Sequence, residues 1–133
     1  MEGTMKNKVS FFLMVCLVVS LCVIAVLAQK ENKPAFARVT LTQSKIGYYD
    51  EIVKLYSESV VPAAKSQKGY LGILLLSNRE TGKGISIAFW ESEEDAIANE
   101  NSGYYKEQVN KFKDYFTAEP VREEYEVTVK DGF

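Results

Sequence analysis

The sequence contains no histidine, and its two cysteines, Cys16 and Cys22, both lie in an apolar segment near the N-terminus. The missing histidine excludes Ser-His-Asp and Cys-His catalysis, histidine-bound zinc and histidine as a haem ligand. The rest of the chain has no thiol, and so no disulfide or thiolate metal site. Any acid–base chemistry must come from carboxylates, tyrosines, lysines or the ligand itself, and we expect no metal site and no cofactor.

The chain also lacks a run of lysines or arginines. Its 133 residues carry a formal net charge of −2, which argues against nucleic acid as a partner. The length allows one domain.

The first part of the chain is predicted to be a targeting segment. Residues 9–28 are apolar and uncharged, and Ala28 is followed by a plausible signal peptidase cut. This stretch is long for a signal peptide and is also able to span a bilayer as an uncleaved anchor, the second alternative. Either usually places the domain outside the cytoplasm, in the periplasm or the extracellular space, with membrane contact only through residues 9–28 if they stay uncleaved. A reversed anchor is a further alternative, because Lys30 and Lys33 flank the far side of the segment. The predicted division is 1–28 signal peptide or anchor, 29–35 linker and 36–133 domain.

Apolar spacing along the domain predicts the order β-α-β-β-α-β. The predicted strands are residues 36–43, 70–78, 85–91 and 121–130. The predicted helices start at Tyr49, restart near Pro62, and then cover about 93–101 and 104–116. This is the ferredoxin-like α+β fold with a four-stranded antiparallel sheet.

Apolar side chains occupy both faces of the second and third predicted strands. Helices cover one face of such a sheet, and a second copy of the chain, packed sheet against sheet, is the simplest cover for the other. Periodicity does not tell which face the helices take. In the second strand, alternation places Leu71, Ile73 and Leu75 on one face and Tyr70, Leu74 and Leu76 on the other. In the last strand, it predicts that Val121, Tyr125, Val127 and Val129 face inward and that Arg122, Glu124, Glu126, Thr128 and Lys130 face outward.

The segment 85–97, ISIAFWESEEDAI, joins the third strand to the next helix. The only tryptophan, Trp90, ends the strand. Ser92 and Asp95 then form an approximate capping box that starts the helix. A large aromatic residue where sheet and helix meet indicates a candidate ligand cleft.

Three motifs carry a resemblance to a known family: VPAA at 61–64, KGYLG at 68–72 and FWESEEDA at 89–96. From Phe36 to Val129 the chain resembles the antibiotic biosynthesis monooxygenase family of dimeric α+β barrels. The resemblance implies a homodimer and a ligand cleft on the Trp90 face of the sheet. The family includes cofactor-independent oxygenases of quinols and polyphenols, haem-degrading enzymes, and members with no known activity.

The haem-degrading branch is matched at one position of three. Trp90 falls on the tryptophan that ruffles the haem, whereas Val109 stands in the place of the haem-ligating histidine. The first-strand asparagine of that branch falls on Ala37, Arg38 or Thr40, depending on alignment. The resemblance therefore argues against haem degradation.

The quinol-oxidising branch is also matched incompletely. Ser86 stands where that branch has an asparagine four residues before the tryptophan, and its tyrosine falls near Ala96. The histidine that many members carry early in the second helix falls near Asn99. Compared with that branch, the implied site has thus lost its acid–base groups or has a different function.

Two functions remain open. The first is an exported cofactor-independent monooxygenase that uses O2, without flavin or metal, on a small aromatic or quinol-type substrate oriented beneath Trp90. The second is a non-catalytic dimer that binds an aromatic or haem-like ligand. The sequence names no substrate and does not decide whether the protein is active.

The candidate site residues also have plainer interpretations. Trp90 as a core aromatic, Arg38 as a solvated or salt-bridged strand residue, and Tyr104 and Tyr105 as packing residues all fit the pattern. The candidate catalytic residue is Trp90, and the candidate ligand-binding residues are Ser86, Asn99, Tyr104, Tyr105 and Arg38.

Overall fold

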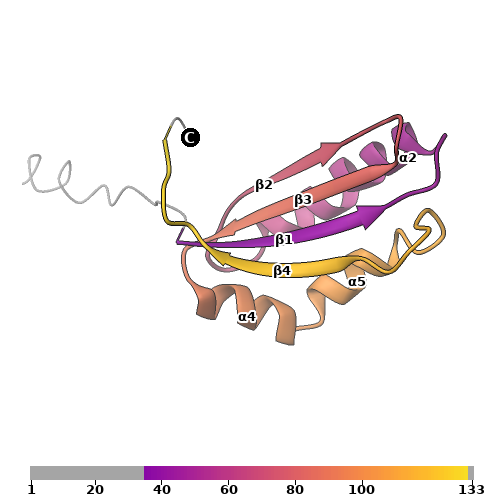
Figure 1. Ribbon diagram of the computed structural model, residues 1–133. Helices are drawn as coiled ribbons and strands as arrows, with labels where there is room; N and C mark the ends of the chain where they lie inside the picture. The colour runs from indigo at the N-terminus through magenta and orange to yellow at the C-terminus, as the bar shows by residue number, and fades with distance from the viewer. Residues whose placement is uncertain (1–34, 132–133) are drawn as a thin grey trace, which may run out of the picture. The chain divides into compact units, whose positions relative to one another are not determined.

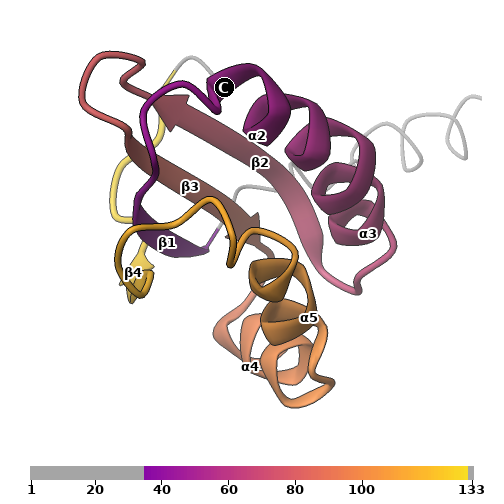
Figure 2. The same ribbon diagram turned by 90° about the vertical axis from the view of Figure 1, so that its right-hand side faces the viewer.

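The computed structural model describes residues 35–131 as a four-stranded antiparallel sheet with helices on one face (Figures 1 and 2). The strand order is β2-β3-β1-β4. The strands are β1 (Phe36–Gln43), β2 (Tyr70–Ser77), β3 (Lys83–Trp90) and β4 (Val121–Glu126). The helices are α2 (Tyr49–Leu55), η1 (Tyr56–Val60), α3 (Val61–Lys65), α4 (Glu93–Asn101) and α5 (Tyr104–Asn110).

The predicted ferredoxin-like βαββαβ fold is confirmed. The predicted targeting segment and all of the predicted linker except Ala35 lie outside the described residues. Within residues 35–131, no helix combines the length and the apolar character needed to cross a bilayer.

The first helical segment runs from α2 to α3 through one π-helical stretch, η1. Pro62 has no N–H and its ring crowds the preceding turn, so a regular α-helix is disfavoured there. The chain widens instead: the N–H of Val61 bonds to the carbonyl of Tyr56, five residues back. The restart near Pro62 is confirmed, with Pro62 in the first turn of α3, but the π-helical stretch was not foreseen.

The capping box at the start of α4 is present in a modified form. Ser92 accepts a hydrogen bond from the Asp95 amide at 3.1 Å, and its hydroxyl donates to the Asp95 carboxylate at 3.0 Å. Asp95 also pairs with Lys68 at 2.9 Å. The end of β3, which carries Trp90, is therefore followed directly by a helix start that these contacts hold in place.

The predicted helix over 104–116 was too long, because α5 ends at Asn110. The segment after it pairs with the end of β1 instead. The amide of Lys45 donates to the Tyr115 carbonyl and the amide of Thr117 to the Gln43 carbonyl, both at 2.8 Å. These bonds bring Phe112 into the core beside Tyr56.

Trp90 lies on the helix-covered face of the sheet, as the resemblance implied. Ile85, Ile87 and Phe89 lie on the opposite face. Their cross-strand partners on β1 are Leu41, Val39 and Ala37, respectively. On the same face Leu76 is 49% exposed. No helix of the described residues covers this face (Figure 2), although Ala37 is buried and the three β3 side chains are half-buried on it.

Two predicted strand faces were wrong. Arg122 and Glu124 lie on the helix side, where Arg122 pairs with Glu100 of α4 and Glu124 with Arg38. Val121 is therefore on the bare face and is 53% exposed. Strand β4 also ends at Glu126, so the predicted residues beyond it lie outside the sheet.

The second wrong face concerns Tyr70. A register shift between Tyr70 and Gly72 turns Tyr70 toward Trp90, with the rings edge-on and their centroids 6.2 Å apart. A bulge of this kind reverses the side of the sheet to which the alternation assigns a residue.

Candidate functional site

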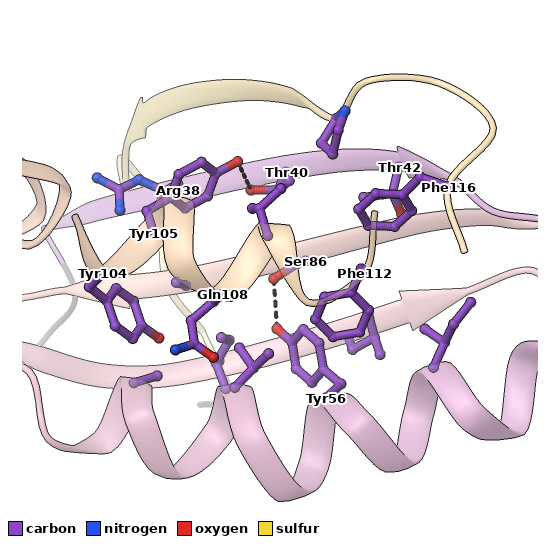
Figure 3. Close-up of a pocket in the computed structure, with 18 of the residues that line it drawn as sticks. Arg38, Thr40, Thr42, Tyr56, Ser86, Tyr104, Tyr105, Gln108, Phe112 and Phe116 are labelled. Carbon is purple, nitrogen blue, oxygen red and sulfur yellow. Dashed lines mark hydrogen bonds between the residues drawn. The ribbon is translucent and has the colours of Figure 1, made fainter. Parts of the chain in front are cut away.

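A cavity of about 780 Å³, including its open mouth, lies between the helix-covered face of the sheet and the helices (Figure 3). Its walls are mostly apolar, and polar groups enter from the sheet, from η1 and from α5. The apolar wall includes Ile73, Leu75, Val109, Phe112 and Phe116.

The structure brings five of the six candidate site residues to this cavity, namely Trp90, Ser86, Tyr104, Tyr105 and Arg38. The sixth, Asn99, is buried but does not line it. Its carbonyl oxygen accepts a hydrogen bond from Arg38 at 3.0 Å. Asn99 therefore supports the arginine from α4.

Arg38 is 3% exposed and is held by three acceptors. Its Nε donates to Glu124 at 2.9 Å, its Nη1 to Asn99 at 3.0 Å and its Nη2 to the Ala96 carbonyl at 2.7 Å. Its guanidinium carbon is also 5.3 Å from the ring centroid of Tyr105. Three of its five N–H donors are committed, and the carboxylate of Glu124 offsets its charge.

Trp90 is 1% exposed and lies at the cavity end of β3. The Arg38 guanidinium carbon is 5.9 Å from its ring centroid. Among residues 35–131 the indole Nε1–H has no hydrogen-bond partner, and neither has the side-chain nitrogen of Asn99. A buried donor without a partner is uncommon and calls for an explanation.

Tyr56 reaches the cavity from η1, and its hydroxyl lies 2.6 Å from that of Ser86 on β3 (Figure 3). Burial raises the pKa of Tyr56 to about 12, although the bond to Ser86 opposes the shift. Tyr56 is therefore protonated at neutral pH. It acts there as a hydrogen-bonding group and not as a base.

A second hydroxyl pair joins Tyr105 of α5 to Thr40 of β1 at 3.2 Å (Figure 3), and Thr40 lies directly opposite Ser86 in the sheet. The neighbouring Tyr104 also lines the cavity. Burial, followed by the nearby Tyr56 and Tyr70, raises the pKa of Tyr104 to about 12, while Arg38 lowers it. Tyr104 is thus a second neutral phenol.

The cavity donates hydrogen bonds but accepts no proton at neutral pH. No carboxylate and no lysine is among the described residues that line it, and Arg38 is its charged group. Residues 35–131 also contain no group of three or more acidic, histidine or cysteine side chains able to hold a metal ion. A reaction here would depend on the acidity of the ligand itself.

Three lining residues that carry polar groups into the cavity, Thr40, Tyr56 and Gln108, were missed as site residues. Tyr56 was placed only in the apolar stripe of its helix, because a regular helix gives no sign of a π-helical stretch. The valine–proline pair at 61–62 was the signal that its position would shift. Gln108 of α5 had no distinguishing pattern.

No family model matches the chain. Two uncharacterized proteins, from two strains of Mycobacterium tuberculosis, are each 29% identical over 102 residues, which cover 74% of this chain. The match is 43% of their length, so the chain spans less than half of these relatives.

Several solved structures have a fold similar to that of this chain. A monooxygenase of Streptomyces coelicolor in complex with nanaomycin D has a TM-score of 0.64 at 15% identity, covering 74% of this chain and 91% of its own. SnoaB, a cofactor-independent oxygenase of Streptomyces nogalater, has a TM-score of 0.61 at 12% identity, covering 74% and 97%.

The haem degrader MhuD of Mycobacterium tuberculosis, with two haems bound, has a TM-score of 0.58 at 19% identity, covering 73% and 99%. The fold of this chain is therefore that of the antibiotic biosynthesis monooxygenase-type proteins. The resemblance carried by the sequence motifs is confirmed at that level.

Proposed function

We propose that this protein belongs to the antibiotic biosynthesis monooxygenase family and oxygenates a small aromatic, quinol-type substrate without a cofactor. One observation carries the proposal. Beneath Trp90 the structure has a mostly apolar cavity whose polar groups include hydroxyls, an amide and the buried Arg38, with no carboxylate or lysine among the described residues that line it. Such a site suits a flat, electron-rich molecule that supplies its own acidic proton and its own electrons.

The reaction balances with O2 alone. A quinol that has lost a hydroxyl proton gives electrons to O2, and a bond forms between a ring carbon and one oxygen atom. The O–O bond then breaks, so that the quinol and O2 yield a hydroxyquinone and one molecule of water. The chain's own residues orient the ring and exclude water, and the positive charge of Arg38 stabilises the anion.

Two solved neighbours support this choice: a monooxygenase crystallised with nanaomycin D, and SnoaB, described as a cofactor-independent oxygenase. Both share the fold of this chain. Arg38, Trp90 and Tyr105 lie close enough together to contact one aromatic ligand.

The second candidate is a non-catalytic protein that binds an aromatic or haem-like ligand. The bonds of Arg38 to Glu124, Asn99 and Ala96 favour it, because they weaken its charge toward a substrate anion. MhuD, which binds haem, also shares the fold. Val109, which replaces the family's histidine by the resemblance, lines the cavity and offers no ligand to iron.

We further propose a homodimer formed through the bare face of the sheet. The face carries Ile85, Ile87 and Phe89 together with the exposed Leu74 and Leu76. Leaving each such side chain in water forfeits roughly 1.5–3 kcal/mol. The outward charged residues of β4 that were expected at the rim of this interface lie on the other side, so the face is more apolar than the sequence suggested.

The proposal includes export through residues 1–28. If they form a cleaved signal peptide, the mature protein begins at Gln29. Intact-mass measurement on the exported fraction checks this, and a membrane-bound protein that retains Met1 would favour the anchor.

Oxygen uptake with a panel of quinols tests the proposed reaction. The wild-type protein should consume O2 in the presence of a metal chelator, and Trp90→Phe should lower the rate at least tenfold. Tyr48→Phe, at a partly exposed residue outside the cavity, is the matched control and should keep the wild-type rate. Ligand binding without oxygen uptake by any quinol would reject the monooxygenase in favour of the binding protein.

A further inference from the structure

The hydroxyl pairs of the cavity each keep one donor for a ligand. Tyr56 bonds to Ser86 and Thr40 to Tyr105, and none of the four hydroxyls has another hydrogen-bond partner within residues 35–131. Within a pair one hydroxyl donates and the other accepts. Whichever way the bond runs, one O–H per pair is uncommitted.

Two further groups are donors only. The indole N–H of Trp90 is buried and has no partner among the residues that the structure describes. The side-chain oxygen of Gln108 lies 3.1 Å from the ammonium of Lys111. Because an ammonium only donates, this contact occupies the carbonyl end of the amide and leaves the NH2 end of Gln108 for the cavity.

Groups that only accept are missing by comparison, and the free lone pairs of the cavity belong to hydroxyls that also carry a proton. No carboxylate lines the cavity among the described residues. Burial raises the pKa values of Tyr56 and Tyr104 to about 12, so both phenols keep their protons. A quinol hydroxyl that accepts one of these donors must also place its own proton, for which the lining offers only the lone pairs of other hydroxyls. A quinone oxygen accepts from a donor and needs no acceptor in return.

We infer that the cavity selects its ligand by acceptor oxygens, and that it binds the quinone form of a flat aromatic molecule in preference to the matched neutral quinol. The inference rests on the proposed aromatic ligand and identifies what determines its specificity: the pairs Tyr56–Ser86 and Thr40–Tyr105. Thr40 of β1 and Ser86 of β3 are direct cross-strand partners in the sheet, and their tyrosines reach them from α5 and η1 (Figure 3). The two pairs are therefore neighbours, which suits two carbonyl oxygens on one ring system.

The same selection applies to a substrate. A quinol that has lost a proton presents an acceptor where it had a donor, so the site favours the anion over the neutral molecule. The donors thereby promote deprotonation of a bound quinol without a base on the protein.

The test compares 1,4-naphthoquinone with 1,4-dihydroxynaphthalene, both under argon, by calorimetric titration of the full-length protein. We expect the quinone to bind at least tenfold more tightly. The double variant Tyr56→Phe/Ser86→Ala removes one pair completely and so leaves no orphaned partner. It should reduce the preference at least threefold while its urea unfolding midpoint stays near the wild-type value. Ser57→Ala removes a hydroxyl of the same helical segment that bonds only to the Val53 carbonyl, and should leave the preference unchanged.

Each outcome separates this inference from the proposed reaction. Equal affinities, tighter binding of the diol, or no binding of either compound would overturn the inference, as would an unchanged preference in the double variant. A protein that prefers the quinone but consumes no oxygen with quinols would overturn the monooxygenase alone. A protein that oxygenates quinols but does not distinguish the two compounds would overturn the inference alone.

Discussion

Replacing Arg38 with methionine removes the buried cation and keeps most of the aliphatic side chain. The side-chain oxygen of Asn99 then loses its donor in a buried position, which costs about 1–3 kcal/mol. The Ala96 carbonyl, inside α4, loses a second bond and adds less. Glu124 is partly exposed and regains water, so it adds little. We expect the free energy of unfolding to fall by about 2–4 kcal/mol.

Urea unfolding followed by Trp90 fluorescence measures this change, provided the slope with denaturant stays constant. Glu124→Gln is the matched variant, because it keeps an acceptor for Arg38 and removes only the charge. Its effect should stay below about 1 kcal/mol. A loss under about 0.5 kcal/mol for Arg38→Met would refute the view that Arg38 organises the contact between the sheet and α4.

Three further predictions concern the sheet face, one turn and one ion pair. Ile87→Asp should give a monomer by light scattering, with helix content retained, and a monomeric wild type at micromolar concentration would contradict the dimer. Gly69→Ala should destabilise the protein more than Gly47→Ala. Both glycines have positive φ, but a Cβ at Gly69 would overlap the Asp95 carboxylate, whereas a Cβ at Gly47 would have no atom within 4 Å among the described residues. Equal losses of unfolding free energy in the two variants would refute the clash. Hydrogen bonds from Lys68, and then from Ser92, hold the pKa of Asp95 below its usual value of 3.8. This carboxylate's contribution to stability is therefore complete above pH 3.8 and is lost as the pH falls through the lower pKa of the folded state. Lys68→Met should reduce the difference between the urea unfolding midpoints at pH 7 and pH 3, and an unchanged difference would reject the pairing.

The order of strands and helices along the chain and the start of α4 were predictable because they rest on local patterns. Alternation marks β1 and β3, and Ser92 caps its helix from a position three residues away along the chain. The side of the sheet taken by Trp90 was not fixed by periodicity. It followed only from the family resemblance, and the structure agrees.

The errors have nonlocal causes. The faces of β4 depend on Arg38 and Glu100, whose pairing with Glu124 and Arg122 gives charged residues partners on the helix side. The early end of α5 depends on backbone bonds to Lys45 and Gln43, about seventy residues earlier in the chain. No window of sequence contains both partners.

The candidate site was predictable in part. Trp90 and Ser86 lie on one strand face, so one strand assignment places both. Tyr56 was not predictable as a site residue, because its approach to Ser86 requires the π-helical stretch before Pro62. Asn99 was placed correctly near the site, but its contact with Arg38 shows a supporting position outside the cavity lining.

The most direct test of the central claim is a crystal structure of the protein grown with 1,4-naphthoquinone. The account predicts the ring beneath Trp90, with its two oxygens in hydrogen-bond distance of the Tyr56–Ser86 and Thr40–Tyr105 pairs. A cavity that stays empty at saturating ligand, or a ligand bound only on the bare face of the sheet beside Ile87, would contradict it.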